Sequence, residues 1–353
     1  MGNVKIKLLA IAAAFAAFAT ACGGNPAGPS GGSGGASDVR VAIALDVGGL
    51  GDKSFNDAAK RGLDKAVADG LISVPNTKLL ETNQTGSNRD ENVTNLADAG
   101  YNLVWANGFS FSPGIDKIAP QYEDVDFAVQ DGYSKDVSNV LNINFKANEG
   151  SFLVGAAAAL KSKTGTIGFL GGQAGTGLIE NFQAGYEAGA KAVNPDINIL
   201  VEYIGDSVQA FVDQTKGEAL SSKMYDQGAD VIFHAAGQSG LGLFKAAVET
   251  GDPDKLAIGV DSDQYRSASP AEQSHILTSM LKRVDVAIYN TIKAVVEGNF
   301  EHGSQVFGLK DNGVAYATSN PELLGDDIQS QLDEFRTKIV NGEITVPEKP
   351  EGA

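Results

Sequence analysis

Charged side chains recur at the ends of predicted strands, where they could hold a small polar ligand. Asp46, Asp131 and Asp261 each follow a short apolar run typical of a buried strand, and Lys282 closes another such run. Carboxylates accept hydrogen bonds from sugar hydroxyls and ring N–H groups, and a lysine beside them avoids burying an unpaired charge. One acidic strand end could arise by chance. Three of them together with a lysine indicate a binding cleft.

Two aromatic residues could supply flat surfaces for the same cleft. Phe55 and Phe182 each lie in the first turns of a predicted helix, and a heterocycle could stack between them. The sequence has no arginine cluster suited to phosphate, so a neutral nucleoside fits better than a nucleotide. Structural interpretations remain open: Asp46 could cap its turn, and Phe55 and Trp105, the sole tryptophan, could be core residues.

The stretch from Val41 to Ala66 predicts the unit that positions the first of these side chains. Residues 41–45 form an apolar strand, a glycine-rich turn follows, and Ser54 is expected to cap a helix in a capping box with Asp57. In doubly wound sheets, ligands bind just beyond the carboxyl ends of the strands. The residues expected there are Asp46, Ser54, Phe55 and Asn56.

Strand and helix signals alternate along the rest of the chain. Strands are predicted at 41–45, 103–106, 127–130, 140–143, 166–170, 197–203, 230–235, 256–260, 276–281, 305–309 and 314–317. Helices are predicted at 54–69, 89–98, 114–119, 148–160, 178–193, 211–227, 241–250, 284–296 and 321–339. Repeated strand–helix units predict an α/β fold of two doubly wound, parallel-sheet lobes.

The N-terminus predicts a secreted, membrane-tethered protein. Residues 1–22 contain an apolar core that follows Lys5 and Lys7, then the small-residue cleavage site Ala19-Thr20-Ala21, and end at Cys22, the sole cysteine. We expect a lipoprotein signal with Cys22 acylated after cleavage, although a plain signal peptide with an incidental cysteine is the alternative. Residues 23–38 are rich in Gly, Ser and Pro, which predicts a flexible tether.

The two lobes are expected to be discontinuous in sequence, because the chain of a bilobal binding protein crosses its hinge several times. The N-terminal lobe is predicted to comprise residues 39–141 and 273–300. The C-terminal lobe is predicted to comprise residues 142–272 and 301–353.

Several functions are disfavoured by composition and motif. The 27 basic and 44 acidic residues give a net charge of −17, which argues against nucleic acid as a partner. The three histidines, His234, His275 and His302, form no metal-binding motif. The glycine-rich segment 171–177 lacks both the dinucleotide fingerprint and the Gly-Lys-Ser/Thr of a phosphate loop. We therefore expect no cofactor, no metal and no enzymatic activity.

At the strand-end and helix-start residues described first, the sequence resembles the basic membrane protein (PnrA-like) family, which comprises lipoprotein receptors of ABC transporters for purine nucleosides. The resemblance covers nearly all of the chain after the tether. Its most specific segments are Leu45–Asp57, Asn148–Phe169, Phe182–Ile197, Ile258–Tyr265 and Leu277–Tyr289. It implies two lobes of the type I periplasmic-binding-protein fold.

The resemblance also implies roles for individual residues. Asp46, Phe55 and Asn56 would hold the ligand from the first lobe, Asp131 would contact a base edge, and Phe182 would be the second stacking ring. Gly237 would let the backbone approach the ligand, and Asp261 and Lys282 would hold ribose hydroxyls. Further candidates are Ser54, Trp105 and Gly108.

The function implied is capture of a purine nucleoside by hinge closure and its delivery to an ABC permease. The protein would be a monomer, lipid-anchored on the extracytoplasmic face of the cell membrane. Two alternatives remain open: a ligand-gated surface sensor that docks to a signalling partner, and a binding protein for riboflavin or a sugar. A nucleoside-processing enzyme would need an acid–base pair or a nucleophile, and neither is evident.

Overall fold

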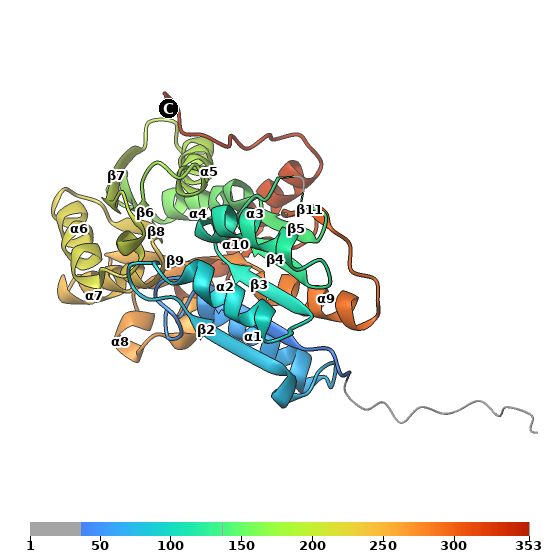
Figure 1. The fold of residues 1–353 in the computed structure, drawn as a ribbon. Helices are drawn as coiled ribbons and strands as arrows, with labels where there is room; N and C mark the ends of the chain where they lie inside the picture. Colours follow the sequence, from blue (N-terminus) through green and yellow to red (C-terminus); the bar gives the residue numbers. More distant parts are fainter. Residues whose placement is uncertain (1–36, 136, 353) are drawn as a thin grey trace, which may run out of the picture. The chain divides into compact units, whose positions relative to one another are not determined.

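The computed structural model describes residues 37–135 and 137–352, whose strands form two six-stranded sheets (Figure 1). The first sheet has the order β11 (Gly303–Phe307), β5 (Val140–Phe145), β4 (Asp126–Gln130), β3 (Leu103–Asn107), β1 (Val41–Leu45), β2 (Thr77–Glu81). The second has the order β12 (Val314–Tyr316), β10 (Ile276–Lys282), β9 (Leu256–Asp261), β8 (Val231–Ala235), β6 (Thr166–Gln173), β7 (Asn198–Gly205). Among these pairs only β10 and β12 are antiparallel. The predicted α/β class with two parallel sheets is confirmed.

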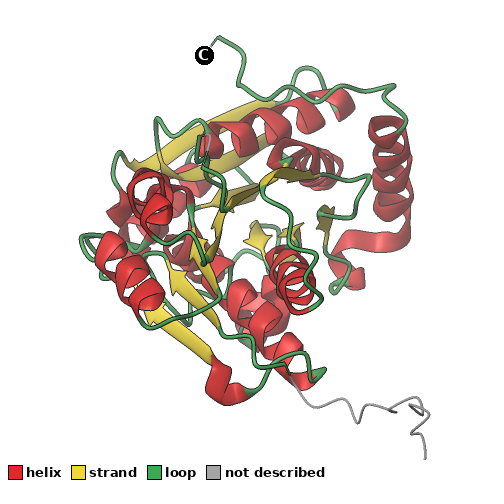
Figure 2. Cartoon of the chain, turned by 45° about the vertical axis from the view of Figure 1, so that its right-hand side comes forward, coloured by secondary structure: helices red, strands yellow, loops and turns green. Residues whose placement is uncertain are grey.

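Helices cover both faces of each sheet (Figure 2). The first lobe contains the first sheet with α1 (Phe55–Ala68), α2 (Arg89–Asp98), α3 (Ser112–Ile118) and α9 (Val284–Val296). The second lobe contains the second sheet with α4 (Ala147–Lys161), α5 (Leu178–Val193), α6 (Gln214–Asp226), α7 (Leu241–Glu249), α8 (Pro270–Gln273) and α10 (Pro321–Val340). Short 3₁₀ turns are η1 (Val74–Asn76), η2 (Phe109–Phe111), η3 (Ala119–Gln121), η4 (Val208–Phe211), η5 (Gly237–Gly240) and η6 (Gln264–Ser267).

The central strand β1 is apolar at every position because both of its faces are covered. Its alternate residues Val41, Ile43 and Leu45 pack in one cluster with the apolar faces of α1 and α9. The intervening Ala42 and Ala44 pack with α2 and α3. A strand buried on both faces reads as a continuous hydrophobic run. β1 ends at Leu45, so Asp46 is the first residue beyond the carboxyl end of this doubly covered strand.

Helices α4 and α5 approach each other at glycines. A Cβ atom added at Gly155 would strike the carbonyl oxygen of Tyr186, and one added at Gly189 would strike that of Phe152. Only a residue without a side chain permits such close backbone approach. The small-residue character of α4 is therefore a packing requirement between two helices of the second lobe.

The chain crosses between the sheets three times in the described residues: from β5 to α4, from β10 to α9, and from β11 to β12. This corrects the predicted lobe boundaries. Strand β10, predicted in the first lobe, pairs with β9 in the second, and β11, predicted in the second, pairs with β5 in the first. The predicted cut at 141 also divides β5. Helix α9 packs on α1, so only the helix of segment 273–300 belongs with the first lobe.

The predicted signal peptide, Cys22 and nearly all of the predicted tether lie in residues 1–36, outside the described part of the chain. Of the helices in that described part, none has the length and apolar content needed to cross a membrane.

Candidate functional site

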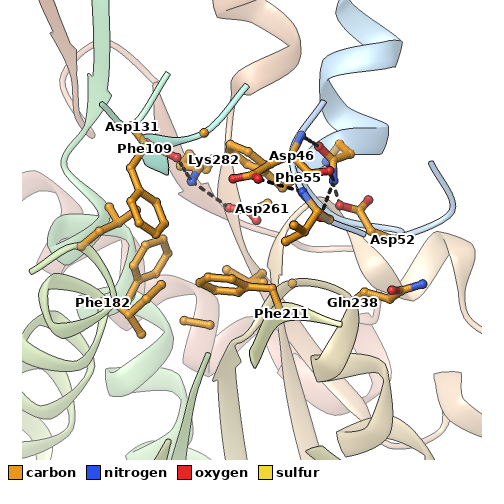
Figure 3. Close-up of a pocket in the computed structure, with 18 residues that line it drawn as sticks. Asp46, Asp52, Phe55, Phe109, Asp131, Phe182, Phe211, Gln238, Asp261 and Lys282 are labelled. Atoms are coloured by element: carbon orange, nitrogen blue, oxygen red, sulfur yellow. Dashed lines mark hydrogen bonds and ion pairs between the residues drawn. The ribbon is translucent and has the colours of Figure 1, made fainter. Parts of the chain in front are cut away.

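One pocket lies where the order of strands reverses in both sheets. The reversal falls between β1 and β3 in the first sheet and between β6 and β8 in the second, and ligands of open α/β sheets bind at such points. The pocket has an empty volume of about 620 Å³, including its open mouth (Figure 3). The predicted residues that line it are Asp46, Phe55, Asn56, Gly108, Asp131, Phe182, Gly237, Asp261 and Lys282.

A buried ionic cluster joins the two lobes inside this pocket. The Lys282 Nζ lies 2.7 Å from Asp131 Oδ2, at the end of β4, and 3.3 Å from Asp261 Oδ1, at the end of β9. The exposed fractions of the three side chains are only 4%, 3% and 8%. Asp261 Oδ1 is buried and has no hydrogen-bond partner in the described chain. Buried acceptors are normally hydrogen-bonded, so this oxygen is suited to accept from a ligand.

Burial and mutual charge act against each other in the cluster. Burial lowers the pKa of Lys282, but the neighbouring Asp131 and Asp261 carboxylates outweigh it, so its pKa is raised and the ammonium is retained. Burial raises the pKa of Asp131, and the charge and hydrogen bond of Lys282 oppose that rise. One ammonium between two carboxylates leaves a net negative charge that favours hydrogen-bond donors on a ligand.

Both carboxylates of the cluster sit on strained backbone. Asp131 has φ of 53° and Asp261 has φ of 63°, in the left-handed region that L-residues rarely occupy. Such strain persists where the surrounding structure over-determines it, and it concentrates at functional sites. At both strand ends, a residue in the left-handed region places its carboxylate in the pocket lining.

Aromatic rings from both lobes line the pocket. The ring centroids of Phe55 and Phe182 lie 4.7 Å and 5.5 Å from Lys282 Nζ, within cation–π range. Phe109, after β3, and Phe211, at the end of η4, meet edge to face with centroids 6.4 Å apart. Only Phe55 and Phe182 were predicted from the sequence as stacking partners.

The Asp46 end of the pocket is held by a polar cluster. Asp46 Oδ1 accepts hydrogen bonds from Arg89 Nε and Nη2 at 2.9 and 2.6 Å and from the Val47 backbone N–H at 2.8 Å. The Asn56 amide bonds to the backbone of Asp46 and Val47 and accepts from Asn107 Nδ2 at 3.1 Å. Asn56 therefore fixes the turn that carries Asp46.

The predicted capping box at Ser54 is wrong. Asp52 caps α1 instead: its carboxylate accepts from the backbone N–H groups of Ser54, Asn56 and Asp57. The buried Ser54 hydroxyl lies 3.0 Å from Asp261 Oδ2 and 3.1 Å from the carbonyl oxygen of Val260. Ser54 thus joins the two lobes behind the pocket and does not line it.

Trp105 does not line the pocket either, which corrects its place among the ligand-binding candidates. Its side chain is fully buried in the core beneath β3, and its Nε1 donates to Asn107 Oδ1 at 3.2 Å. Gly108, three residues later, does line the pocket with φ of 138°. A Cβ atom at this position would collide with Asp46 Oδ2.

Sequence reasoning missed half of the pocket lining. The additional residues are Val47, Asp52, Phe109, Leu178, Ile179, Phe211, Ala235, Gln238 and Val260. Two of these residues could have been found from the sequence. Phe109 lies in the aromatic-rich stretch Trp105–Phe111, and Asp52 lies in Leu45–Asp57, one of the segments that resemble the family. Phe211 had none, because it lies after the edge strand β7 and reaches the pocket only through tertiary packing.

No group of His, Cys, Asp or Glu suited to a metal ion occurs in residues 37–135 or 137–352. The residues that line the pocket can bind a ligand by stacking, hydrogen bonding and charge. Two doubly wound lobes with a pocket formed by the strand ends of both define a solute-binding protein of the type I periplasmic-binding-protein class.

Comparison with known proteins identifies the family. Residues 39–350 match the family described as "ABC transporter substrate-binding protein PnrA-like", and the chain belongs to this family. Proteins of this kind bind a small molecule for a membrane permease and are not enzymes, which agrees with the prediction.

The relatives share nearly the whole chain. The "CD4+ T-cell-stimulating antigen" of Listeria monocytogenes is 36% identical, over 89% of this chain and 90% of its own. The "ABC transporter nucleoside-binding protein BmpA" of Lactococcus lactis is 32% identical, over 89% and 90%. A solved solute-binding protein of an ABC transporter system from Aeropyrum pernix K1 matches with a TM-score of 0.75 and 26% identity, over 88% and 94%.

Proposed function

We propose that this protein captures a purine nucleoside in the inter-lobe pocket and delivers it to an ABC permease. The observation that carries the proposal is the combination of aromatic rings from both lobes with a buried Asp131–Lys282–Asp261 cluster, in which Asp261 Oδ1 is ion-paired with Lys282 but accepts no hydrogen bond within the described residues. Rings suit the flat base, and charged acceptors suit N–H and hydroxyl donors. The nucleoside-binding relative from Lactococcus lactis supports the same ligand class.

Within this proposal each lobe contributes one ring and one set of polar groups. Phe55 and Phe182 stack on the base, and Asp46 and Asp131 face its polar edges from the first lobe. Asp261 and Lys282 hold the ribose hydroxyls, and Gly237 leaves room for close backbone approach. Closure around the ligand shifts the population toward the closed form, because the ligand contacts both lobes only there.

A ligand panel tests this function directly. Thermal unfolding of protein lacking residues 1–22 is followed with guanosine, adenosine, inosine, cytidine, uridine, riboflavin, ribose and galactose. A ligand present at about a hundredfold over its dissociation constant adds roughly 2.7 kcal/mol of stability. We expect a shift with purine nucleosides that is lost in Asp261→Ala and Phe55→Ala.

The exposed Asp254→Ala variant is the matched control, since within residues 37–135 and 137–352 the Asp254 carboxylate pairs only with Lys163 at the surface. Its ligand response should equal that of the parent protein. A shift only with riboflavin or a sugar would agree with the fold assignment but would exclude a nucleoside as the ligand. No shift with any ligand, in protein unfolded and refolded to remove bound material, would favour a sensor of another signal.

We also propose that Cys22 carries a lipid anchor and that the anchored protein works as a monomer outside the cytoplasm. The sole cysteine directly follows the predicted cleavage site. Expression of Cys22→Ser should move the protein from the membrane fraction to the soluble fraction. Retention of this variant in the membrane would refute the anchor, and light scattering of the soluble form tests the monomer.

A further inference from the structure

The two oxygens of the Asp46 carboxylate lie in different surroundings. Oδ1 accepts all three of the hydrogen bonds made by this group, two from the Arg89 side chain and one from the Val47 N–H. Oδ2 has no hydrogen-bond partner in the described residues and lies against Gly108, whose missing side chain leaves it uncovered. Since Asp46 lines the pocket, Oδ2 is the oxygen left for a ligand.

Arg89 is held away from the pocket. Its Nη1 donates to the carbonyl oxygen of Gly86 at 3.3 Å, and its guanidinium carbon lies 5.7 Å from the ring centroid of Phe111. The Arg89 and Asp46 side chains are 11% and 12% exposed, so the ion pair is nearly buried. Both donors go to the same carboxylate oxygen instead of one to each, which leaves Oδ2 free.

The charge of Arg89 also bears on the protonation of Asp46. Burial raises the pKa of Asp46, while the charge and hydrogen bonds of Arg89 oppose that rise. Two other carboxylates lie on neighbouring segments. Asp52 caps α1, and the Glu81 side chain lies against Gly49. Across the pocket are the charged groups of Asp131, Asp261 and Lys282.

We propose that Arg89 is a positioning residue for ligand recognition: it occupies Asp46 Oδ1 and directs Oδ2 into the pocket as a charged acceptor. The site then selects a base that presents an N–H donor to Oδ2 and rejects one that presents only an acceptor there. The selectivity part rests on the proposed function. The control of Asp46 by Arg89 stands independently of it.

Calorimetric titration of the purified protein with inosine, guanosine and adenosine tests the selectivity, between about pH 5.5 and 8. Because burial raises the pKa of Asp46 and of Asp52, which both line the pocket, the parent protein should lose some affinity towards the acidic end, but less than Arg89→Met loses. Arg89→Met should bind at least about tenfold more weakly at the acidic end and recover as pH rises, because Asp46 must lose its proton to accept strongly. Arg89→Lys, which restores a cation but not the paired donors, should lie between them.

Two further variants separate this effect from a structural one. Asp46→Asn combined with Arg89→Met removes the carboxyl group of Asp46, and the extra loss of affinity that Arg89→Met shows at low pH should disappear. Arg40→Met alters an arginine at the opposite end of β1, where Arg40 bonds to the Ala99 carbonyl, and should bind like the parent. Equal weakening of Arg89→Met at every pH, or unchanged affinity, would overturn the proposal.

A measurement without ligand keeps this inference distinct from the function. The carboxyl carbon of Asp46, labelled with ¹³C and assigned through Asp46→Asn, is titrated by NMR in the parent and in Arg89→Met. Its pKa should rise in Arg89→Met and stay unchanged in Arg40→Met. If no nucleoside binds the parent, the proposed function fails, while a rise still supports control of Asp46 by Arg89. An unchanged pKa overturns that control.

Discussion

Lys282 supplies the counter-charge for two buried carboxylates that come from different lobes. Replacing it with methionine leaves Asp131 and Asp261 facing each other without a cation, a change that costs roughly 3–5 kcal/mol in buried ion pairs. Urea unfolding of Lys282→Met at neutral pH should show a loss of this size. Adding Asp131→Asn should restore part of it, because only one buried carboxylate then remains. A stability equal to that of the parent would show that the cluster is not ionised as described.

The titration of Asp52 should make the free energy of unfolding decrease as the pH rises. Burial raises its pKa from 3.8 to about 6, against three hydrogen bonds from backbone N–H groups. The folded protein therefore binds more protons than the unfolded chain between these values, so this residue's contribution to stability falls as pH rises from about 4 to about 6. The change amounts to about 3 kcal/mol.

Asp52→Asn removes this component. Denaturant unfolding of parent and variant across that pH window should show a flatter dependence in the variant, even though losing an acceptor at the cap lowers its stability overall. Parallel curves for the two proteins would contradict a raised pKa at Asp52.

Single residues at strand ends could be predicted because the cue is local. Asp46 and Asp261 each follow an apolar run, and both line the pocket. Arg89 was not predicted, because it meets Asp46 across 43 positions of sequence. Ser54 was misread for the same reason: its helix-cap pattern is local, but its hydroxyl partner is Asp261, 207 positions away.

At the scale of elements, apolar periodicity predicted most helices closely. Residues 89–98, 178–193 and 284–296 match α2, α5 and α9. Strand β2 was missed because it is an edge strand, only partly buried, whose sequence TKLLE lacks a clear alternation. The assignment of β10 and β11 to lobes was wrong because strand pairing depends on non-local hydrogen bonds that leave no mark in either strand.

The approach of α4 and α5 gives an element-scale prediction. Gly189→Val places a side chain against the Phe152 carbonyl oxygen and forces the helices apart. We expect a loss of at least 1–3 kcal/mol in the free energy of unfolding, the usual cost of overpacking. Ala192→Val, on the exposed side of the same helix, is the control and should cost about 0.5 kcal/mol or less. Similar losses for both variants would mean that helix propensity, not contact, decides.

At the scale of the molecule, the two lobes are tied together by more than the connecting segments. The bonds of Ser54 with Asp261 and of Lys282 with Asp131 cross between lobes next to the pocket. A ligand that stacks on Phe55 and Phe182 would lie beside these contacts. Ligand stabilisation should therefore be cooperative, with a single unfolding transition shifted upward rather than one lobe unfolding first. Differential scanning calorimetry with and without guanosine would show this, and two separated transitions would argue against it.

The three crossings of the chain also set an order on biosynthesis. Strand β11 completes the first sheet, yet it is made after almost all of the second. A nascent chain that has emerged only to residue 300 has an unpaired edge at β5 in the first sheet and at β10 in the second. Exposed strand edges are templates for wrong pairing with other chains. Residues 303–316 therefore supply an outer strand to each sheet, and a chain that stops short of them exposes the inner strands β5 and β10 as edges in both lobes at once.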